Sequence, residues 1–426
     1  MKKLTSFLFF LLIMAYVSAQ DTYLHCGKLI NTKSGKIQSE MTIIVSGNRI
    51  TSVQKGYINA KAANDKTVDL KSKTVMPGLI DMHVHIEGET SPTRYLEAFT
   101  KNDADVAFTA AEIANRTLLA GFTTVRDLGG SGVNVALRDA IAKGKVPGPR
   151  IYTVEKAIGT TGGHADPTNG RRRELMGDPG PAEGVINSPE DARKAVRQRY
   201  KNGADLIKIT ATGGVLSVSK NGHNPQFMQD EVNEIVKTAK EYGMVVAAHA
   251  HGDEGMKRAI KAGVQTIEHG SMMTKETASL MKQYNTYLVP TLSAGRYVAE
   301  KAKVPNYYPE IIIPKILKID AALRKTFAMV YKEGVPIAFG TDAGVFPHGE
   351  NAKEFGYMVE TGWSPMFSIQ SATTTNAKLL DMENELGQLA TGFLADIVAT
   401  DEDPTKNIHT METISFVMKN GKIYKE

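Results

Sequence analysis

The sequence predicts an α/β protein: a (β/α)8 barrel of the TIM type with a small composite β-sandwich built from both ends of the chain. Between residues 77 and 379, short apolar runs alternate with amphipathic helical stretches, as in successive β–α units. Residues 20–76 and 380–426 carry short β-type runs separated by turn signals. No Gly-x-Gly-x-x-Gly follows the first apolar strand, which disfavours the alternative of a doubly wound open sheet.

The first 19 residues have the pattern of a signal peptide. Two lysines precede an apolar run over 7–17, and the small residues at 17–19 offer a cleavage site. The run is short for a transmembrane helix, so we expect an exported protein, periplasmic or secreted, with no stable membrane insertion after cleavage. An uncleaved signal anchor is the alternative.

Both ends of the mature chain are expected to contribute strands to the small β domain. Turn signals lie at Ser34-Gly35 and Gly47-Asn48, and Asn420-Gly421 is a hairpin signal near the C-terminus. The expected strands are Tyr23–Ile30, Met41–Ser46, Arg49–Val53, Gly387–Leu389, Asp396–Ala399, Ile414–Val417 and Lys422–Tyr424.

The central region supplies eight candidate strands with helices between them. The expected strands are Ile80–His85, Thr123–Asp127, Arg150–Val154, Leu206–Thr210, Val245–His249, Thr266–His269, Leu288–Thr291 and Ile337–Thr341. The expected helices are Asp103–Ala120, Val133–Ala142, Pro189–Asn202, Asp230–Tyr242, Glu254–Ala262, Lys275–Tyr284, Pro314–Glu333 and Ser364–Lys378.

Composition narrows the function classes. The chain has 426 residues, of which 42% are hydrophobic and 23% charged, with a net charge of +5 spread along its length. This balance is typical of a globular protein and gives no nucleic-acid surface. Cys26 is the only cysteine, so an internal disulfide is excluded and a metal site must use other side chains. A small molecule is the expected partner, and self-association stays open.

Six side chains that can bind metals lie at or near the ends of the predicted barrel strands: His83, His85, Lys208, His249, His269 and Asp342. Side chains alternate along a strand, so His83 and His85 point to the same face. Barrel active sites lie at the C-terminal ends of the strands, where all six would meet around one rim. Imidazole and carboxylate groups suit zinc and similar cations.

Lys208 lies inside a predicted buried strand, where a lysine needs a partner. One interpretation is an ion pair with Asp205 or Glu268. The other is that its amine has reacted with carbon dioxide to form a carbamate, an anion whose two oxygens can bridge two metals.

These motifs resemble those of the amidohydrolase superfamily, in its binuclear type, over nearly the whole mature chain. Two segments are similar in particular to the imidazolonepropionase-like group that includes Xaa-Pro and other Xaa-amino-acid dipeptidases. The motifs are Pro77–His85, Lys208, His249, Ile267–Gly270, Gly340–Asp342 and Gly387–Val398, and the two group-specific segments are Thr161–Asp166 and Thr212–Val215.

The resemblance implies a binuclear centre and a role for each residue. His83, His85 and Asp342 would hold one divalent ion, expected to be zinc, and His249 and His269 a second. Carboxylated Lys208 and a hydroxide would bridge the two ions, with Asp342 as the catalytic general base and acid.

The implied function is an exported metal-dependent hydrolase of amide or peptide bonds, most simply a dipeptidase that acts on small peptides. A hydrolase of cyclic amides, of the imidazolonepropionase or hydantoin type, is the enzymatic alternative. A metal-binding scaffold without catalysis is the alternative from another class.

Candidate substrate contacts are less specific. The resemblance suggests that His164 touches the scissile carbonyl or the substrate carboxylate, although it could equally stabilise its glycine-rich loop. His251 is expected beside the ligands, and His223 and His348 in loops that line the pocket or are exposed. Candidates for binding a peptide carboxylate are Arg171, Arg172, Arg173, Arg296 and Tyr297.

Overall fold

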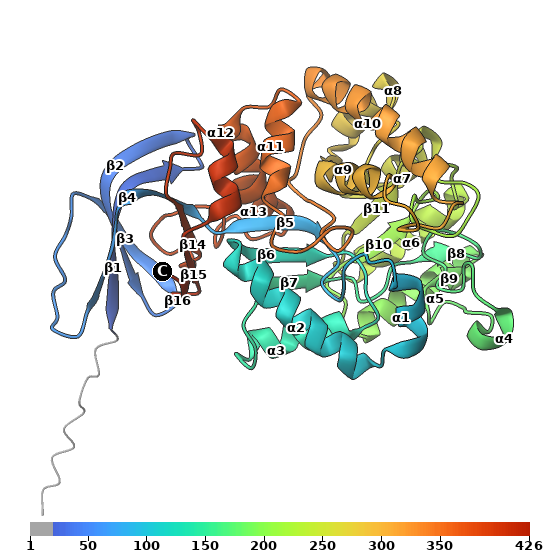
Figure 1. The fold of residues 1–426 in the computed structure, drawn as a ribbon, viewed down its shortest axis with the longest axis horizontal. Helices are drawn as coiled ribbons and strands as arrows, with labels where there is room; N and C mark the ends of the chain where they lie inside the picture. Colours follow the sequence, from blue (N-terminus) through green and yellow to red (C-terminus); the bar gives the residue numbers. More distant parts are fainter. Residues whose placement is uncertain (1–19) are drawn as a thin grey trace, which may run out of the picture.

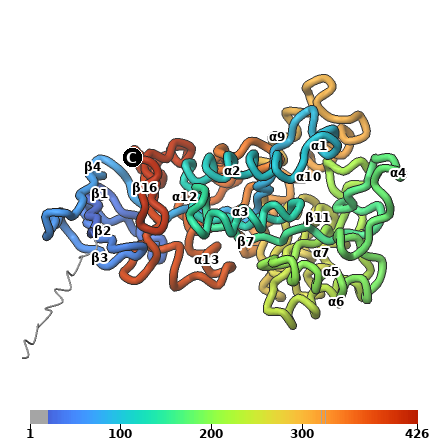
Figure 2. The backbone as a smooth tube through the Cα atoms, turned by 90° about the horizontal axis from the view of Figure 1, so that it is seen from below, coloured from blue at the N-terminus to red at the C-terminus, as the bar shows by residue number. Residues whose placement is uncertain are grey.

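The computed structural model describes residues 20–426, so the predicted signal peptide lies outside the described residues. The chain forms a curved sheet at one end and a larger body of parallel strands and helices at the other (Figure 1). The first and last strands lie at the same end of the molecule (Figure 2) and belong to one sheet.

Both ends of the chain build one seven-stranded sheet in the order β16-β15-β14-β4-β1-β2-β3. Only β1 and β4 pair in parallel; the other neighbours are antiparallel. The strands are β1 (Asp21–Asn31), β2 (Lys36–Ser46), β3 (Arg49–Lys55), β4 (Lys66–Pro77), β14 (Ile397–Thr400), β15 (Phe416–Lys419) and β16 (Lys422–Lys425).

This single sheet differs from the expected sandwich of two sheets. The segment before β14 hydrogen-bonds to edge strand β3, since Ile50 N donates to Phe393 O at 2.9 Å. The sheet therefore curls, and side chains from both ends share one apolar cluster that includes Ile43 and Phe416. The expected strand Gly387–Leu389 is wrong: Gly387 has φ +79°, a left-handed conformation that an extended strand excludes.

The larger body contains two sheets of parallel strands, in the orders β5-β6-β7 and β10-β11-β12-β13, and a two-stranded pair, β8-β9. Their bounds are β5 (Leu79–Val84), β6 (Phe122–Asp127), β7 (Arg150–Thr153), β8 (Gly159–Thr160), β9 (Val185–Ile186), β10 (Ile207–Thr210), β11 (Val246–Ala250), β12 (Thr266–His269) and β13 (Tyr287–Val289).

Hydrogen bonds connect the two parallel sheets. Asp205 N donates to Thr153 O (2.7 Å), which joins the β10 side to β7. Ala338 N donates to Leu288 O (2.9 Å), and Met82 N donates to Phe339 O (3.0 Å). The segment after residue 336 therefore lies between β13 and β5.

The expected eighth strand, Ile337–Thr341, is wrong as a regular strand, because it forms only isolated bridges at Ile337 and, just beyond its end, at Ala343. The reason is local chemistry. The Asp81 carboxylate accepts hydrogen bonds from the Thr341 backbone N–H (3.1 Å) and hydroxyl (2.7 Å), which takes that amide out of a strand ladder.

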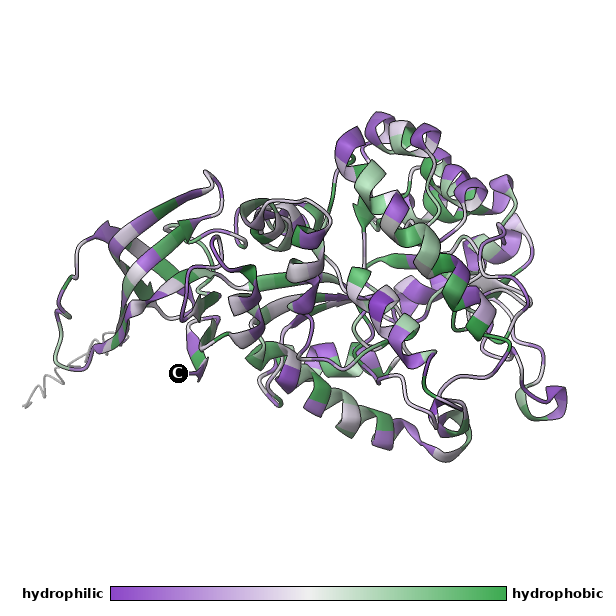
Figure 3. Ribbon diagram, turned by 45° about the horizontal axis from the view of Figure 1, so that its top comes forward, coloured by the Kyte–Doolittle hydropathy of each residue, from purple (hydrophilic) through white to green (hydrophobic). Residues whose placement is uncertain are grey.

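Helices cover the parallel strands, which are mainly hydrophobic, while the helices alternate hydrophobic and hydrophilic residues (Figure 3). They are α1 (Arg94–Thr100), α2 (Asp103–Leu119), α3 (Val133–Ala142), α4 (Arg173–Met176), α5 (Pro189–Lys201), α6 (Gln229–Glu241), α7 (Asp253–Ala262), α8 (Lys275–Tyr284), α9 (Leu292–Lys301), α10 (Ile313–Glu333), α11 (Lys353–Glu360), α12 (Pro365–Gln370) and α13 (Asn376–Leu379). A π-helical turn (Ser371–Thr375) joins α12 to α13, and a 3-10 turn (Ile408–Thr413) precedes β15.

The eight predicted helices are present within a few residues, with the last divided by the π-helical turn. The helices α1, α4, α9 and α11 were not predicted. For α1, α4 and α11, which have 7, 4 and 8 residues, the reason is that short helices give little periodic pattern. Within residues 20–426, no helix is both long and apolar enough for a membrane span.

Candidate metal centre and active site

A cavity of about 860 Å³ opens over the C-terminal ends of the parallel strands. All the predicted site residues line it, together with one histidine that was expected only nearby. These residues are His83, His85, His164, Lys208, His249, His251, His269 and Asp342.

His83, His85 and Asp342 have the geometry of a cation site. The Nε2 atoms of both histidines lie 3.4 Å from the same oxygen, Oδ1 of Asp342. Ligand atoms at about 2.0–2.1 Å around a tetrahedral ion lie about 3.4 Å apart, so the spacing fits zinc coordination. Oδ1 is buried and has no hydrogen-bond partner among the described residues, as expected for an atom whose partner is a cation.

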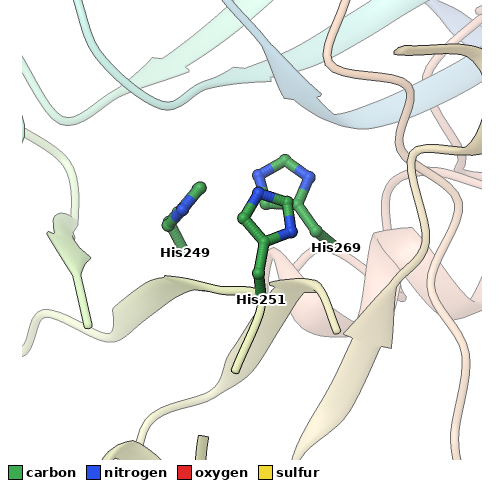
Figure 4. A group of neighbouring side chains, drawn as sticks. All are labelled: His249, His251 and His269. Carbon is green, nitrogen blue, oxygen red and sulfur yellow. The ribbon is translucent and has the colours of Figure 1, made fainter. Parts of the chain in front are cut away.

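A second group lies directly beside the first. Ligand atoms of His249, His251 and His269 lie within 4.8 Å of one another, and His269 also groups with His83 and Asp342. His249 and His251 come from the end of β11 and His269 from the end of neighbouring β12 (Figure 4). His251 therefore lies closer to the candidate ligands than the sequence indicated.

A hydrogen-bond partner at Nδ1 orients each of three imidazoles. Nδ1 of His83 lies 2.9 Å from Glu268 Oε2, and Nδ1 of His85 lies 2.8 Å from Gly129 O. Nδ1 of His269 lies 2.7 Å from Thr291 Oγ1. Because each Nδ1 is engaged, the Nε2 atom is the one presented to the cavity, which is the usual arrangement around bound metals.

Lys208 lies on β10 and is 3% exposed. Both carboxylates considered as its partner are engaged elsewhere: Asp205 pairs with Arg138 (2.9 Å) and Glu268 with Arg126 (2.9 Å). No carboxylate of the described residues lies within 4.0 Å of the Lys208 amine. The alternative of a direct ion pair with Asp205 or Glu268 is therefore wrong.

Burial dominates the electrostatics of these residues. It lowers the pKa of His85 to about 3, with a further contribution from the charge of Lys208, and it lowers the pKa values of His83, His249 and His269. The imidazoles are therefore neutral near pH 7, the form that binds metals. Burial also raises the pKa of Asp342 to about 7, although Lys208 opposes this shift.

Three residues that line the cavity have left-handed backbones. The φ angles are +71° for His269, +53° for Thr291 and +60° for Asp342. Non-glycine residues rarely adopt this conformation, and such strain is concentrated at functional sites. The strained turns aim these side chains into the cavity.

His164 lies in the cavity wall, with its ring centroid 4.5 Å from that of His249. Its Nδ1 is buried and has no hydrogen-bond partner among the described residues. Gly214 makes room for the ring, because a Cβ there would lie 2.2 Å from His164 Cε1. This placement favours contact with a ligand over the alternative of a loop-stabilising histidine.

The other histidines lie outside the cavity. His223 contacts Lys318, and His348 is buried. The expectation that His348 lines the pocket or is exposed is wrong, because its ring packs inside and lies 3.1 Å from the backbone oxygen of His85.

Among the expected carboxylate-binding residues, only Arg171 lines the cavity. Arg172 pairs with Glu174 and Arg296 with Glu360. Tyr297 bonds to Tyr307, and no contact brings it or Arg173 into the cavity.

Sequence reasoning missed two contributors to the site. Glu268 was considered only as a partner of Lys208, whereas it orients His83 and pairs with fully buried Arg126. Arg94 lines the cavity from α1. The Glu268-His269 pair at a strand end was a usable signal, but nothing local marks Arg94.

The chain belongs to the amidohydrolase family, whose family model matches residues 74–424. As a member, it is an enzyme that hydrolyses carbon–nitrogen bonds of amides or peptides. The fold and the donor set agree with this assignment.

Three relatives narrow the comparison. A Xaa-Pro dipeptidase with methionine bound in its active site is 51% identical, with a TM-score of 0.92 over 96% of this chain and 100% of the other. A prolidase complexed with N-methylphosphonate-L-proline is 30% identical, with a TM-score of 0.86 over the same shares. Ochratoxinase from Aspergillus niger is 31% identical over 97% of this chain and 89% of its own length.

Proposed function

We propose that this enzyme is an exported metal-dependent dipeptidase that cleaves Xaa-Pro or other Xaa-amino-acid bonds. One observation carries the proposal: three ligand atoms spaced for a tetrahedral cation lie beside a second histidine group inside one cavity. The dipeptidase and prolidase relatives support the substrate class. Export rests on the signal-like residues 1–19.

The proposed ligand set follows from the donors. His83, His85 and Asp342 would hold one divalent ion, and His249 and His269 the other, with His251 adjacent. Lys208 would join both as a carbamate, since its buried amine has no carboxylate partner among the described residues. Two divalent ions held there would polarise the amide carbonyl and lower the pKa of a coordinated water. Zinc is the ion that this donor set favours.

The chain's own residues would handle the proton and the substrate. Asp342 would accept a proton at the reacting centre and deliver it to the leaving nitrogen. His164, with its unpartnered Nδ1, would hold the carbonyl or the carboxylate of the substrate. We also propose that the segment between β13 and β5 completes a closed (β/α)8 barrel, which would hold these strand ends at fixed distances.

The test is a screen of a dipeptide library with zinc-loaded wild type and Asp342→Asn, with metal content measured for each. We expect two ions per chain in the wild type, hydrolysis of a subset of dipeptides, and a loss of kcat of about 10²- to 10⁴-fold in Asp342→Asn.

Asp401→Asn is the matched control, because Asp401 pairs with Lys73 on the surface and its removal leaves activity unchanged. Unimpaired hydrolysis in Asp342→Asn would refute the proposed role of Asp342. Opening of cyclic amides without dipeptide hydrolysis would favour the cyclic-amide alternative.

A further inference from the structure

Arg94 lines the cavity and has no ion-pair partner among the described residues. Its Nη1 donates to Thr90 Oγ1 at 3.1 Å, and no carboxylate of the described residues lies within 4.0 Å of its guanidinium. A guanidinium carries five N–H donors in a planar fork. Most of these donors therefore have no acceptor within residues 20–426.

Three carboxylates that line the cavity have partners other than Arg94. Glu97 binds Lys101 (3.0 Å), Glu89 binds Arg116 (3.0 Å), and Glu87 accepts from the backbone N–H of Ser131 (2.7 Å). These carboxylates therefore form no ion pair with Arg94, and its guanidinium is accessible to an anion that enters the cavity.

Besides Lys208, two further cations of the cavity wall lack a carboxylate partner among the described residues, namely Arg171 and Lys156. The Arg171 guanidinium lies 5.3 Å from the centre of the Phe99 ring and is directed towards Met176. The Arg171 guanidinium is thus packed against the cavity wall, whereas the Arg94 guanidinium has one side-chain acceptor among the described residues, Thr90 Oγ1.

Hydrogen bonds connect Thr90 and Tyr95, which lie close to Arg94 in the chain, to segments that border the cavity. Thr90 N donates to Gly344 O (2.7 Å), two residues after Asp342, and Tyr307 OH donates to Thr90 O (3.3 Å). Tyr95 OH donates to Leu216 O (3.1 Å), which follows Gly214, the residue that packs against the His164 ring. The start of α1, which carries the exposed Arg94, is therefore held between the segment after Asp342 and the segment around Leu216.

We propose that Arg94 binds the carboxylate of the substrate's C-terminal residue while the scissile amide lies at the candidate metal centre. The inference rests on the proposed function, because the C-terminal carboxylate is the one anion common to all dipeptides. A guanidinium can grip it through two parallel hydrogen bonds. The substrate class is thereby narrowed to dipeptides and N-acyl amino acids with a free carboxylate, and C-terminal amides are disfavoured.

The experiment compares Met-Pro with its C-terminal carboxamide in the zinc-loaded wild type, Arg94→Met, Arg94→Lys and Lys101→Met. We expect the wild type to prefer the acid, and Arg94→Met to lose about 10- to 100-fold in kcat/KM on the acid, mainly through KM. Its rate on the amide stays unchanged. Arg94→Lys should recover part of the loss, because it restores the charge without the fork. Lys101→Met is the control, since Lys101 also lines the cavity but is paired with Glu97.

Equal losses on both substrates, or an acid preference that survives Arg94→Met, would overturn the inference. Loss of that preference in Arg171→Met instead would assign the contact to Arg171. A wild type that cleaves acid and amide equally refutes the role of Arg94 and leaves the dipeptidase proposal intact.

If the wild type cleaves neither substrate, the dipeptidase proposal is refuted for Met-Pro. Calorimetry with N-acetyl-L-proline then decides the Arg94 contact separately. At least tenfold weaker binding to Arg94→Met than to Lys101→Met supports it, and equal binding overturns it.

Discussion

The seven-stranded sheet and the cavity rim both contain buried side chains, but those of the sheet are mainly apolar and those of the rim are polar. The sheet encloses Leu, Ile, Val, Met and Phe side chains and the thiol of Cys26, and its backbone groups are paired along the strands. The rim encloses histidines, Lys208 and Asp342, and leaves Asp342 Oδ1 and His164 Nδ1 without partners among the described residues. Apolar burial stabilises a fold, whereas unpaired polar burial costs stability and is retained where it serves a ligand.

The comparison also explains the backbone. The rim holds His269, Thr291 and Asp342 at positive φ. The strands of the seven-stranded sheet differ from the rim. Residues 21–31 and 66–77 contain no positive φ angle, and Glu40 in β2 is the one strand residue of this sheet that has one. The other positive φ angles beside these strands lie in turns. The sheet is thus a scaffold in relaxed geometry, and the rim stores strain that the surrounding packing supports.

The largest effect on the cavity rim is expected from removing the amine of Lys208. Lys208→Met keeps the apolar stem of the side chain and deletes the group proposed to bridge two ions. Loss of an outer partner of a metal ligand costs about 10- to 100-fold, so loss of the bridging group should lower activity by more than about 100-fold. Metal analysis should show fewer ions per chain, while urea denaturation shows no loss of stability. Full activity in the variant would remove Lys208 from the centre.

The converse test removes a core side chain from the sheet. Phe416 is fully buried on β15, and Phe416→Ala should lower the free energy of unfolding by about 3–5 kcal/mol. Because the sheet carries no site residue, kcat at 25 °C should match the wild type. Urea titration and steady-state kinetics on the same preparation check both. A large fall in kcat with the fold retained would mean that the two regions are coupled.

A smaller effect is expected from changing a residue that contacts a candidate metal ligand. Glu268 is buried between Arg126 and His83, so Glu268→Gln keeps the shape and removes the charge that orients the imidazole. We expect zinc affinity to fall about 10- to 100-fold, as measured by competition with a chelator. Glu276→Gln is the control, because Glu276 pairs with Lys257 on the surface. Unchanged affinity would show that Glu268 supports only the fold.

The smallest effect concerns a buried lysine of the sheet. Lys419 is buried on β15 and donates to Gly148 O at 2.7 Å, and burial lowers its pKa from 10.5 to about 8. Between pH 8 and 10.5, the unfolded chain therefore binds more protons than the folded one, so this group makes stability rise with pH. The stability of the wild type relative to Lys419→Met should increase from pH 7.5 to 9.5 in urea titrations. Exposed Lys36→Met should show no such trend, and a flat difference for Lys419→Met would contradict the shift.

Much of the fold could be predicted because burial leaves a periodic pattern in the sequence. Apolar runs marked β5, β10 and β12, and Ser364-Pro365 marked the start of α12. The expected strand at Ile337 was mistaken because the pattern does not show that the Asp81 carboxylate takes the amide of Thr341. The two expected β layers became one curled sheet because β3 pairs with residues more than 300 positions away.

What the sequence determined by itself is the inventory of the site: two histidines one residue apart, and a lysine, two histidines and an aspartate at or near later strand ends. These follow from local residue order. Only the tertiary structure decided how that inventory is used. It brought both His83 and His85 within 3.4 Å of Asp342 Oδ1, separated Lys208 from its expected carboxylate partners, and placed Arg94 on the cavity wall. The physical reason is that distances between side chains from different strands depend on packing across the whole molecule, which no local pattern records.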